Sequence, residues 1–263
     1  MRISKPLRSE MGWSNRDTIT VRGFDLTTDL LGKVDLGAMA WLEITGRLPT
    51  SKEAEVFNSL LITLVEHGMT PQAISTRLIA TCSPEAMQAA VAAGLLGVGS
   101  VFAGGSEQIA RLLQTALDGK DDAADLAAIA SAIVDDHVTR KSPIPGIGHP
   151  IHKPVDPRTP VLFGIAERNG YRGRYVALLE AIAATAERRL NRSLPINATG
   201  AIGAVLSELG FPWRICRGVA IIGRAVGLVG HIAEEMRNPL GLEIWERIDH
   251  EVMTNATSDG GEP

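Results

Sequence analysis

The segment RKSPIPGIGHPIHKPVDPR, residues 140–158, decides how the chain is read, because it contains five of the fourteen prolines. Proline fixes φ and biases the preceding residue away from helix, so the segment is predicted to be an ordered loop between helices. Gly146 and Gly148 are expected to leave backbone N–H groups uncovered beside His149. The loop has one acid, Asp156, against six basic or imidazole side chains: Arg140, Lys141, His149, His152, Lys153 and Arg158. This balance favours an anionic ligand.

Outward from this loop, the composition predicts an all-α protein. Hydrophobic residues make up 45% of the 263 residues, but aromatic residues only 4%. Cores of Ala, Leu, Ile, Val and Gly with little alternation favour closely packed helices over sheets. The length suffices for one large domain or for a larger and a smaller lobe.

Caps, glycines and prolines divide the helical pattern into segments. Asp35 is placed to cap the first helix, and TNATSDGGEP at the end of the chain is expected to fray. The predicted helices are 36–45, 51–67, 71–81, one opened by 83–85, 106–117, 121–139, 159–168, 171–191, 201–209, 213–236 and a short amphipathic piece after 241.

Charge and targeting signals exclude several classes of function. The chain has 26 basic and 30 acidic residues, a net charge of −4, which argues against nucleic acid or an anionic membrane as the main partner. The first residues lack the apolar core of a secretory signal, and the uncharged run 86–106 is rich in Ala and Gly, as in a buried helix rather than a span. Cys82 and Cys216 are expected to be buried, reduced thiols in a cytoplasmic protein.

Several segments, in order, resemble one family. GIGHPIHKPVDPR (146–158) resembles the GFGH and DPR loop of citrate synthases, and IPGIGH is especially similar to the citryl-CoA lyase portion of ATP citrate lyase. INATGAIGAVLSELGF (196–211) resembles the helix that starts with NVDG, and IGRAVGLVGHIAEE (222–235) the GRxxGxxxH helix. GRLPT, EHG and AGLLGVGSVFAGG follow the same order, so the resemblance covers roughly residues 20–250.

The resemblance implies a compact, two-lobed helical fold whose active site forms between the lobes, usually in a homodimer. It places the large lobe at 1–103 and 205–263, and the small lobe, which carries the PGIGH loop, at 104–204. The implied chemistry makes or breaks a carbon–carbon bond next to a CoA thioester. The CoA thioester is then a substrate, and no permanently bound cofactor is expected.

Individual roles carry over by position. The resemblance implies that His149 hydrogen-bonds a keto or hydroxyl oxygen, that Arg158 and Arg224 clamp substrate carboxylates, and that His67 lies near the same carboxylates. It places CoA along Pro145, Gly146, Ile147, Gly148 and Lys153. From the residues alone, His149 could instead cap a local turn, Arg224 could be a structural charge with its own partner, and His67 could be a helix end favoured by the helix dipole.

Three positions depart from the family pattern. The catalytic aspartate of NVDG falls on Thr199, the histidine of the HGG segment on Ala103, and the arginine after the loop histidine on Pro150. Threonine cannot serve as the carboxylate base, and losing a general base costs roughly 10²–10⁴-fold in rate. His152, Glu234 and Glu235 are candidates to supply the proton instead, or Thr199 could position a water.

Two functions therefore stay open. The first is a CoA-dependent lyase similar to citryl-CoA lyase, which cleaves citryl-CoA or a related 3-hydroxyacyl-CoA into an acyl-CoA and an oxo acid. The second is a non-catalytic or regulatory paralogue that binds acyl-CoA or a polycarboxylate. The sequence contains no Gly-rich phosphate loop and no metal-ligand spacing, so ATP hydrolysis and a metal site are not predicted.

Overall fold

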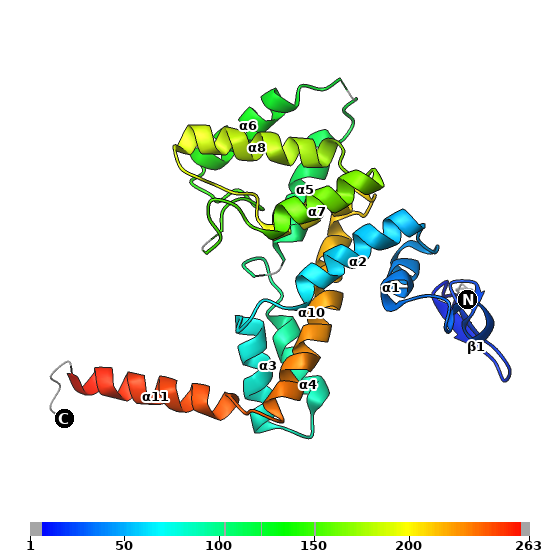
Figure 1. Cartoon of the computed structure of the whole chain (residues 1–263), viewed down its shortest axis with the longest axis vertical. Coiled ribbons are helices and arrows are strands. Elements are labelled where there is room, and N and C mark those ends of the chain that lie inside the picture. The colour runs from blue at the N-terminus through cyan, green and yellow to red at the C-terminus, as the bar shows by residue number, and fades with distance from the viewer. Residues whose placement is uncertain (1–6, 103, 122, 150, 259–263) are drawn as a thin grey trace, which may run out of the picture. The chain divides into compact units, whose positions relative to one another are not determined.

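The computed structural model describes residues 7–102, 104–121, 123–149 and 151–258. In this part of the chain it contains a small antiparallel sheet, a short π-helix and eleven α-helices (Figure 1). The elements are β1 Gly12–Ser14, β2 Ile19–Val21, β3 Phe24–Asp25, η1 Leu26–Leu30, α1 Leu36–Thr45, α2 Ser51–Val65, α3 Pro71–Cys82, α4 Met87–Leu96, α5 Gly105–Leu117, α6 Leu126–Thr139, α7 Arg158–Asn169, α8 Arg174–Leu190, α9 Ala198–Glu208, α10 Trp213–Glu235 and α11 Gly241–Ser258. The predictions for Ala103, Asp122, Pro150 and 259–263 concern positions outside the described residues.

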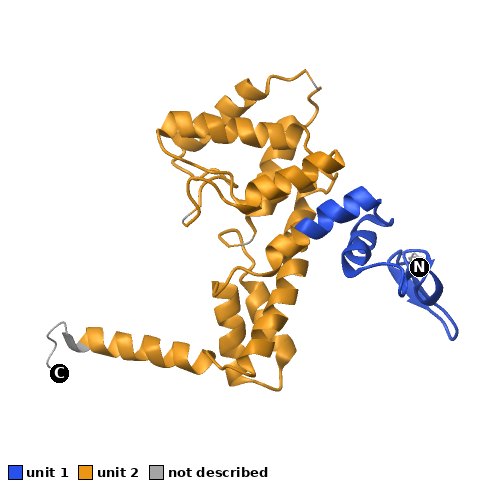
Figure 2. Cartoon of the chain, in the orientation of Figure 1, with its two compact units in different colours: residues 1–59 blue, residues 60–263 orange. Residues whose placement is uncertain are grey.

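The chain divides into two compact units, residues 1–59 and 60–263 (Figure 2). The first unit contains the meander β1–β2–β3, η1, α1 and the start of α2. Trp41 packs edge-on against Phe57 at a centroid distance of 5.4 Å, and both side chains are buried. The sheet was not predicted, because its strands are two or three residues long and their alternation is too short to detect.

The second unit is built around α5, α9 and α10. Helix α9 packs against α5, α7 and α8, while α10 packs against α3, α4 and α5. Every residue from Gly200 to Ser207 is buried, so α9 is a central helix without a solvent face. Gly203 permits close packing on α5, because a Cβ there would lie 2.5 Å from the Ser106 carbonyl oxygen. Helix α6 lies beside α8 (Figure 1).

Most predicted helices are present, but several ends differ. Helix α2 ends at Val65, so His67 lies in the following loop and not at a helix end. Helix α5 starts at Gly105, with Ser106 inside it, and Asp125 rather than Asp121 caps α6. Helix α9 starts at Ala198 because the Asn197 side chain accepts the N–H of Gly200 and caps it.

The C-terminal prediction was wrong in part. Residues 254–258 belong to α11, an amphipathic helix of 18 residues whose start contacts α3. Gly241 allows this contact, because a Cβ there would lie 2.0 Å from Thr81 Oγ1. The segment 86–106 also differs from the prediction, since its described residues form α4 at Met87–Leu96 and only the first two residues of α5, Gly105 and Ser106, with non-helical chain between them.

Among the described helices, α10 is long and apolar enough to cross a membrane by length and composition. Half of the most apolar 18-residue stretch of α10 is buried within the chain, as expected for a core helix. Cys216, on this helix, is buried as predicted, and burial raises the pKa of its thiol to about 12. Cys82 is exposed at the end of α3, which corrects the prediction that both thiols are buried.

The proline-rich loop 140–157 is ordered against the residues that precede α9. Ile147 pairs with Ile196 in an antiparallel bridge, and the Gly148 N–H donates to the Pro195 carbonyl at 2.7 Å. Gly146 and Gly148 adopt φ values of 78° and 82°, which favour glycine. The expectation that Gly148 leaves its N–H uncovered was therefore wrong, because the loop backbone pairs with the chain next to it.

Candidate active site

One cavity of about 200 Å³ in the second unit gathers five of the predicted site residues. Four polar groups around it come from the loop after α2, from the proline-rich loop and from the starts of α7 and α9, and the fifth comes from the middle of α10. These residues are His67, His149, Arg158, Thr199 and Arg224. Leu64, Phe102 and Ile202 add apolar walls. A small cavity with apolar walls and a few convergent polar groups is the usual form of a ligand site.

Arg224 is the strongest feature of this cavity. Its side chain is only 5% exposed, and its Nε and Nη1 have no hydrogen-bond partner among the described residues. Burial lowers the pKa of Arg224, the nearby Glu66 charge opposes this, and an arginine stays protonated in either case. A buried charge is costly unless it is paired, so this guanidinium is suited to an anionic ligand.

His149 does cap a local turn, and this fixes its tautomer. Its Nδ1 accepts the backbone N–H groups of Ile151 and His152 at 3.1 and 3.0 Å. A nitrogen that accepts two hydrogen bonds carries no proton, so we infer that the neutral ring bears its proton on Nε2. Burial, followed by the charge of His152, lowers the pKa of His149 below 6.5. The turn and the proposed donor role therefore coexist in one side chain.

Arg158 is held by an acid from its own loop. Its Nε and Nη2 donate to the two oxygens of Asp156 at 2.9 and 2.8 Å. Asp156 is fully buried and also accepts the N–H of Ala198 at 2.9 Å, which ties the loop to the start of α9. Burial alone would raise the pKa of Asp156, but hydrogen bonds from Arg158 and Ala198 lower it to about 2. Arg158 thus reaches the cavity with its charge already partly balanced.

Thr199 lies in the first turn of α9. Its hydroxyl donates to the Asn197 side-chain oxygen at 2.7 Å. A Cβ on Gly105 would lie 2.8 Å from this hydroxyl, so the start of α5 closes the other side. The hydroxyl proton is thus committed to Asn197, and only the lone pairs of Thr199 remain for a ligand or a water.

The other proton-donor candidates differ in position. Glu234 and Glu235 do not line the cavity, because both contact Arg77 behind it. The His152 ring lies against that of His149, with 4.4 Å between the centroids.

Three imidazoles meet beside the cavity. His67, His149 and His152 each offer one ring nitrogen within 4.8 Å of the others, a spacing that could hold a metal ion. His149 fits such a role badly. A metal bound to Nδ1 of His149 would displace the backbone N–H groups of Ile151 and His152. A metal bound to Nε2 would displace the proton that Nε2 carries while Nδ1 accepts these hydrogen bonds. The structure therefore gives little support to a metal site, and the sequence predicted none.

The predicted CoA-binding residues are split. Gly146 is buried and accepts the Asn197 N–H through its carbonyl at 3.0 Å, while Pro145 and Ile147 are half-buried. Lys153 is exposed and lines neither this cavity nor the second, larger cavity that opens beside the proline-rich loop, described next.

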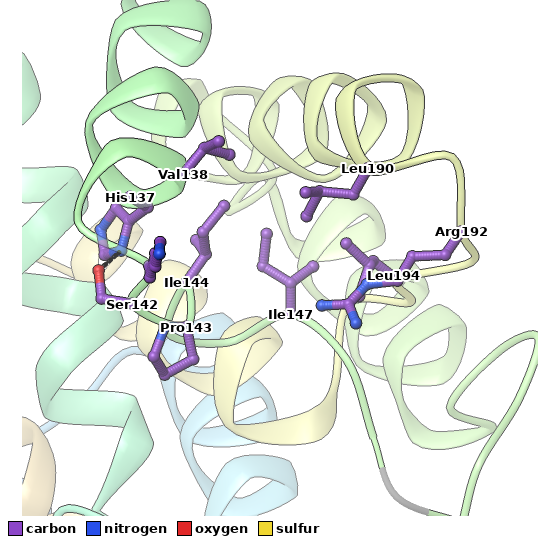
Figure 3. Close-up of a pocket in the computed structure, with 10 residues that line it drawn as sticks. His137, Val138, Ser142, Pro143, Ile144, Ile147, Leu190, Arg192 and Leu194 are labelled. Atoms are coloured by element: carbon purple, nitrogen blue, oxygen red, sulfur yellow. Dashed lines mark hydrogen bonds between the residues drawn. The ribbon is translucent and has the colours of Figure 1, made fainter.

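A second cavity, of about 410 Å³, opens beside the same loop (Figure 3). Its walls are apolar side chains from the end of α6, the loop and the end of α8, among them Val138, Ile144, Ile147, Leu190 and Leu194. Lys141 and Arg192 also line it, as does His137, whose Nδ1 lies 3.1 Å from Ser142 Oγ. An apolar slot with basic groups suits a planar, anionic group such as a nucleotide.

Sequence reasoning missed two residues that organise the site. Asn197 caps α9 and also donates from its side-chain nitrogen to the Gly148 carbonyl at 2.8 Å, so it joins Thr199 to the loop. An asparagine just before a helix is a recognisable cap signal. Glu66 accepts the N–H groups of His67 and Gly68, and its position in EHG was the available signal.

Comparison with known proteins agrees with this arrangement. Residues 14–245 match the family model described as citrate synthase, C-terminal domain. The chain belongs to the citrate synthase family. It is similar to the citryl-CoA lyase from Hydrogenobacter thermophilus, with a TM-score of 0.79, 32% identity and coverage of 89% of this chain and 88% of that one.

More distant members of the citrate synthase family agree. The putative citrate synthase 2 of Mycobacterium tuberculosis is 28% identical over 192 residues, which cover 72% of this chain and 49% of that protein. The ATP citrate lyase of Methanothrix soehngenii shares the fold, with a TM-score of 0.73, 22% identity and coverage of 90% and 40%. The chain spans about half the length of the curated relatives it matches.

The predicted family and the helical citrate synthase-like fold are thus confirmed. The lobe boundaries at 104 and 204, and the roles of the individual site residues, remain predictions.

Proposed function

We propose that the chain is a CoA-dependent carbon–carbon lyase that cleaves citryl-CoA or a related 3-hydroxyacyl-CoA. The observation that carries the proposal is the buried guanidinium of Arg224, whose Nε and Nη1 have no hydrogen-bond partner among the described residues, in a cavity that also contains His149 and Arg158. A planar fork with free donors suits a carboxylate, and Arg158 offers a second cation for another carboxylate. The similarity to the citryl-CoA lyase from Hydrogenobacter thermophilus supports the same substrate class.

The proposed chemistry is a retro-Claisen cleavage. The β-hydroxyl loses its proton, the bond between the α- and β-carbons breaks, and its electron pair passes to the thioester enolate, which then takes up a proton at carbon. The Nε2–H of His149 donates to the oxygen that becomes the carbonyl and stabilises its negative charge. His152, with its ring against that of His149, is the imidazole that we assign to proton exchange at this oxygen.

We propose that the cavity in Figure 3 receives the nucleotide end of CoA. Its apolar walls suit a planar base, and Lys141 and Arg192 suit phosphates. This assignment places CoA on the side of the loop that carries Ile147, one of the predicted CoA-binding residues. No permanently bound cofactor is required, because the thioester is itself the substrate.

We also propose a cytoplasmic homodimer. Exposed apolar side chains on α10 and α11 support an oligomer, since they have no cover within the described chain. They are Val226 and Val229 of α10, Met236 directly after α10, and Leu242, Trp245, Ile248 and Val252 of α11.

A specific observation favours the alternative, a non-catalytic paralogue that binds acyl-CoA or a polycarboxylate. Thr199 occupies the position of the family's carboxylate, and its hydroxyl is committed to Asn197. In such a paralogue, the groups that bind the ligand, among them Arg158 and Arg224, would be retained while the carboxylate base at position 199 is absent. Binding and cleavage must therefore be measured separately.

Isothermal titration calorimetry with citrate and CoA tests the binding half. We expect the wild type to bind both, and Arg224→Gln to weaken citrate binding about 10-fold or more while CoA affinity is retained. Ile221→Val, at an exposed position on the same helix outside the proposed dimer surface, is the control. Equal citrate affinity in the wild type and Arg224→Gln, or no citrate binding by the wild type, would contradict the proposal.

A further inference from the structure

One face of α10 connects the cavity to a buried polar cluster behind it. Arg224, Gly227, His231 and Glu235 follow at helical spacing, and all four are buried. Arg224 lines the cavity, whereas His231 and Glu235 meet Arg77 of α3. The same helix therefore carries both an arginine whose Nε and Nη1 lack a hydrogen-bond partner in the described part of the chain and the partners of another buried arginine.

Arg77 fixes which ring nitrogen of His231 accepts a hydrogen bond. Its side chain is 1% exposed and donates from Nη1 to Glu235 at 2.7 Å, while Nη2 contacts Glu234. Its Nε donates to His231 Nδ1 at 3.1 Å. Since arginine Nε always carries a proton, Nδ1 of His231 is the accepting nitrogen, and the proton of the neutral ring lies on Nε2.

Nε2 of His231 faces Glu66. It lies 3.0 Å from Glu66 Oε2, a close contact whose direction departs from a hydrogen bond. The other carboxylate oxygen accepts the backbone N–H groups of His67 and Gly68. Gly227 makes room for this segment, because a Cβ there would lie 1.9 Å from the Val65 carbonyl oxygen and 3.3 Å from Glu66 Oε2.

Glu66 is also the acid whose charge acts on Arg224. An anionic side chain near an unpaired, buried guanidinium would be expected to pair with it, yet neither Nε nor Nη1 of Arg224 has a described partner. The contacts that Glu66 does make are with His231 and with the backbone N–H groups of residues 67 and 68.

We propose that His231 is a positioning residue that keeps Glu66 away from Arg224 and so leaves Arg224 available to a substrate carboxylate. This inference rests on the proposed function for its ligand, but its geometry concerns only the chain itself. Arg77 orients His231, His231 holds Glu66, and Glu66 in turn fixes the backbone of His67 at the edge of the cavity. The relay from Arg77 through His231 to Glu66 thus acts on Arg224 and His67, which line the cavity, although His231 itself does not line it.

The test is a pair of linked substitutions. We expect His231→Leu, which leaves Glu66 free to turn to Arg224, to weaken citrate binding about 10- to 100-fold in calorimetry. Adding Glu66→Gln to His231→Leu removes the competing carboxylate and should restore most of the affinity. If His231 only stabilised the fold, adding Glu66→Gln would not restore the citrate affinity lost in His231→Leu. Ile221→Val, an exposed position on the same helix outside the proposed dimer surface, is the control, and circular dichroism checks that each variant is folded.

A second readout needs no ligand. The Arg224 Nε–Hε signal in a ¹H–¹⁵N spectrum, assigned with Arg224→Lys, should shift in His231→Leu, where a carboxylate pairs with it, and return in the double variant. If the wild type binds no citrate but this pattern is seen, the proposed function fails and the relay stands. An unmoved signal in folded His231→Leu, or a double variant that stays shifted, would overturn the relay.

Discussion

Thr199 donates its hydroxyl proton to the side-chain oxygen of Asn197 at 2.7 Å, in the first turn of α9. The hydroxyl thereby completes the cap of the helix, in which the same oxygen also accepts the Gly200 N–H at 3.0 Å. A threonine in this state has no basic group to take a proton from carbon. Its position is nonetheless on the cavity wall, beside the residues proposed to bind the substrate.

Restoring a carboxylate at this position should restore proton abstraction. We expect Thr199→Asp to raise the rate of exchange of the α-protons of acetyl-CoA in D₂O, by roughly 10²-fold or more, because a general base is regained. Thr199→Asn has a similar size but no base and should not gain. The exchange is followed by mass spectrometry of the recovered thioester. Equal rates in the two variants would show that position 199 does not face the α-carbon.

The two buried arginines should respond oppositely to removal of their charge. Arg224→Met removes a buried guanidinium that lacks described hydrogen-bond partners, so we expect the melting temperature without ligand to stay the same or rise. Arg77→Met removes the only described cation paired with buried Glu235, which keeps only hydrogen bonds from neutral groups such as the backbone N–H groups of Leu240 and Gly241, and should cost about 3–5 kcal/mol of unfolding free energy.

Urea unfolding of the ligand-free proteins measures both effects. A large loss of stability in Arg224→Met would mean that Arg224 is paired in the protein and is not reserved for a ligand.

The tautomer of His149 predicts a loss of activity in acid. Burial and His152 lower its pKa below 6.5, so the folded loop favours the neutral ring, and the associated stability is present above pH 6.5 and lost as the pH falls through the lowered pKa. Protonation of Nδ1 would expel the N–H groups of Ile151 and His152. We expect kcat/KM for thioester cleavage to be level above pH 6.5 and to fall below it.

The fall of kcat/KM below pH 6.5 should be absent from the residual activity of His149→Gln. A wild-type profile that rises in acid would show that the imidazolium is the active form.

Asp156 should make the loop acid-sensitive at a lower pH. Its pKa is about 2 in the folded chain and near 3.8 without these contacts, so its contribution is present above pH 3.8 and lost as the pH falls toward 2. We expect Asp156→Asn to lose roughly 2 kcal/mol of unfolding free energy at pH 7, and this deficit to shrink below pH 4. Urea unfolding from pH 7 to pH 3 measures the change. A deficit independent of pH would assign the effect to packing.

Much of the helical pattern could be predicted because caps and breakers act locally. Asp35 caps α1 as predicted, and Gly46 ends it in a left-handed conformation. The errors arose where several caps compete within a few residues, as with Asp121 and Asp125 before α6. The amphipathic piece after Gly241 was predicted, but its length was underestimated because the Thr- and Asn-containing end of α11 has weak helix propensity.

The site was partly predictable for a different reason. His67, His149, Arg158 and Arg224 were found by their order along the chain, and the fold brings them to one cavity. The relay from Arg77 to His231 could not be found this way, because 154 positions separate the two residues and no local pattern links them. The hydrogen bonds that use the Gly148 N–H and the Thr199 hydroxyl also depend on neighbours that only the folded chain supplies.

The most direct test of the proposed function is product analysis by mass spectrometry. Purified protein would be incubated with citryl-CoA and a small panel of 3-hydroxyacyl-CoA thioesters, beside His149→Ala. We predict release of an acyl-CoA and an oxo acid by the wild type, reduced roughly 10²-fold or more in His149→Ala, because the donor to the reacting oxygen is lost. Absence of cleavage across the panel, with citrate or CoA still raising the melting temperature, would contradict the lyase and establish the binding paralogue.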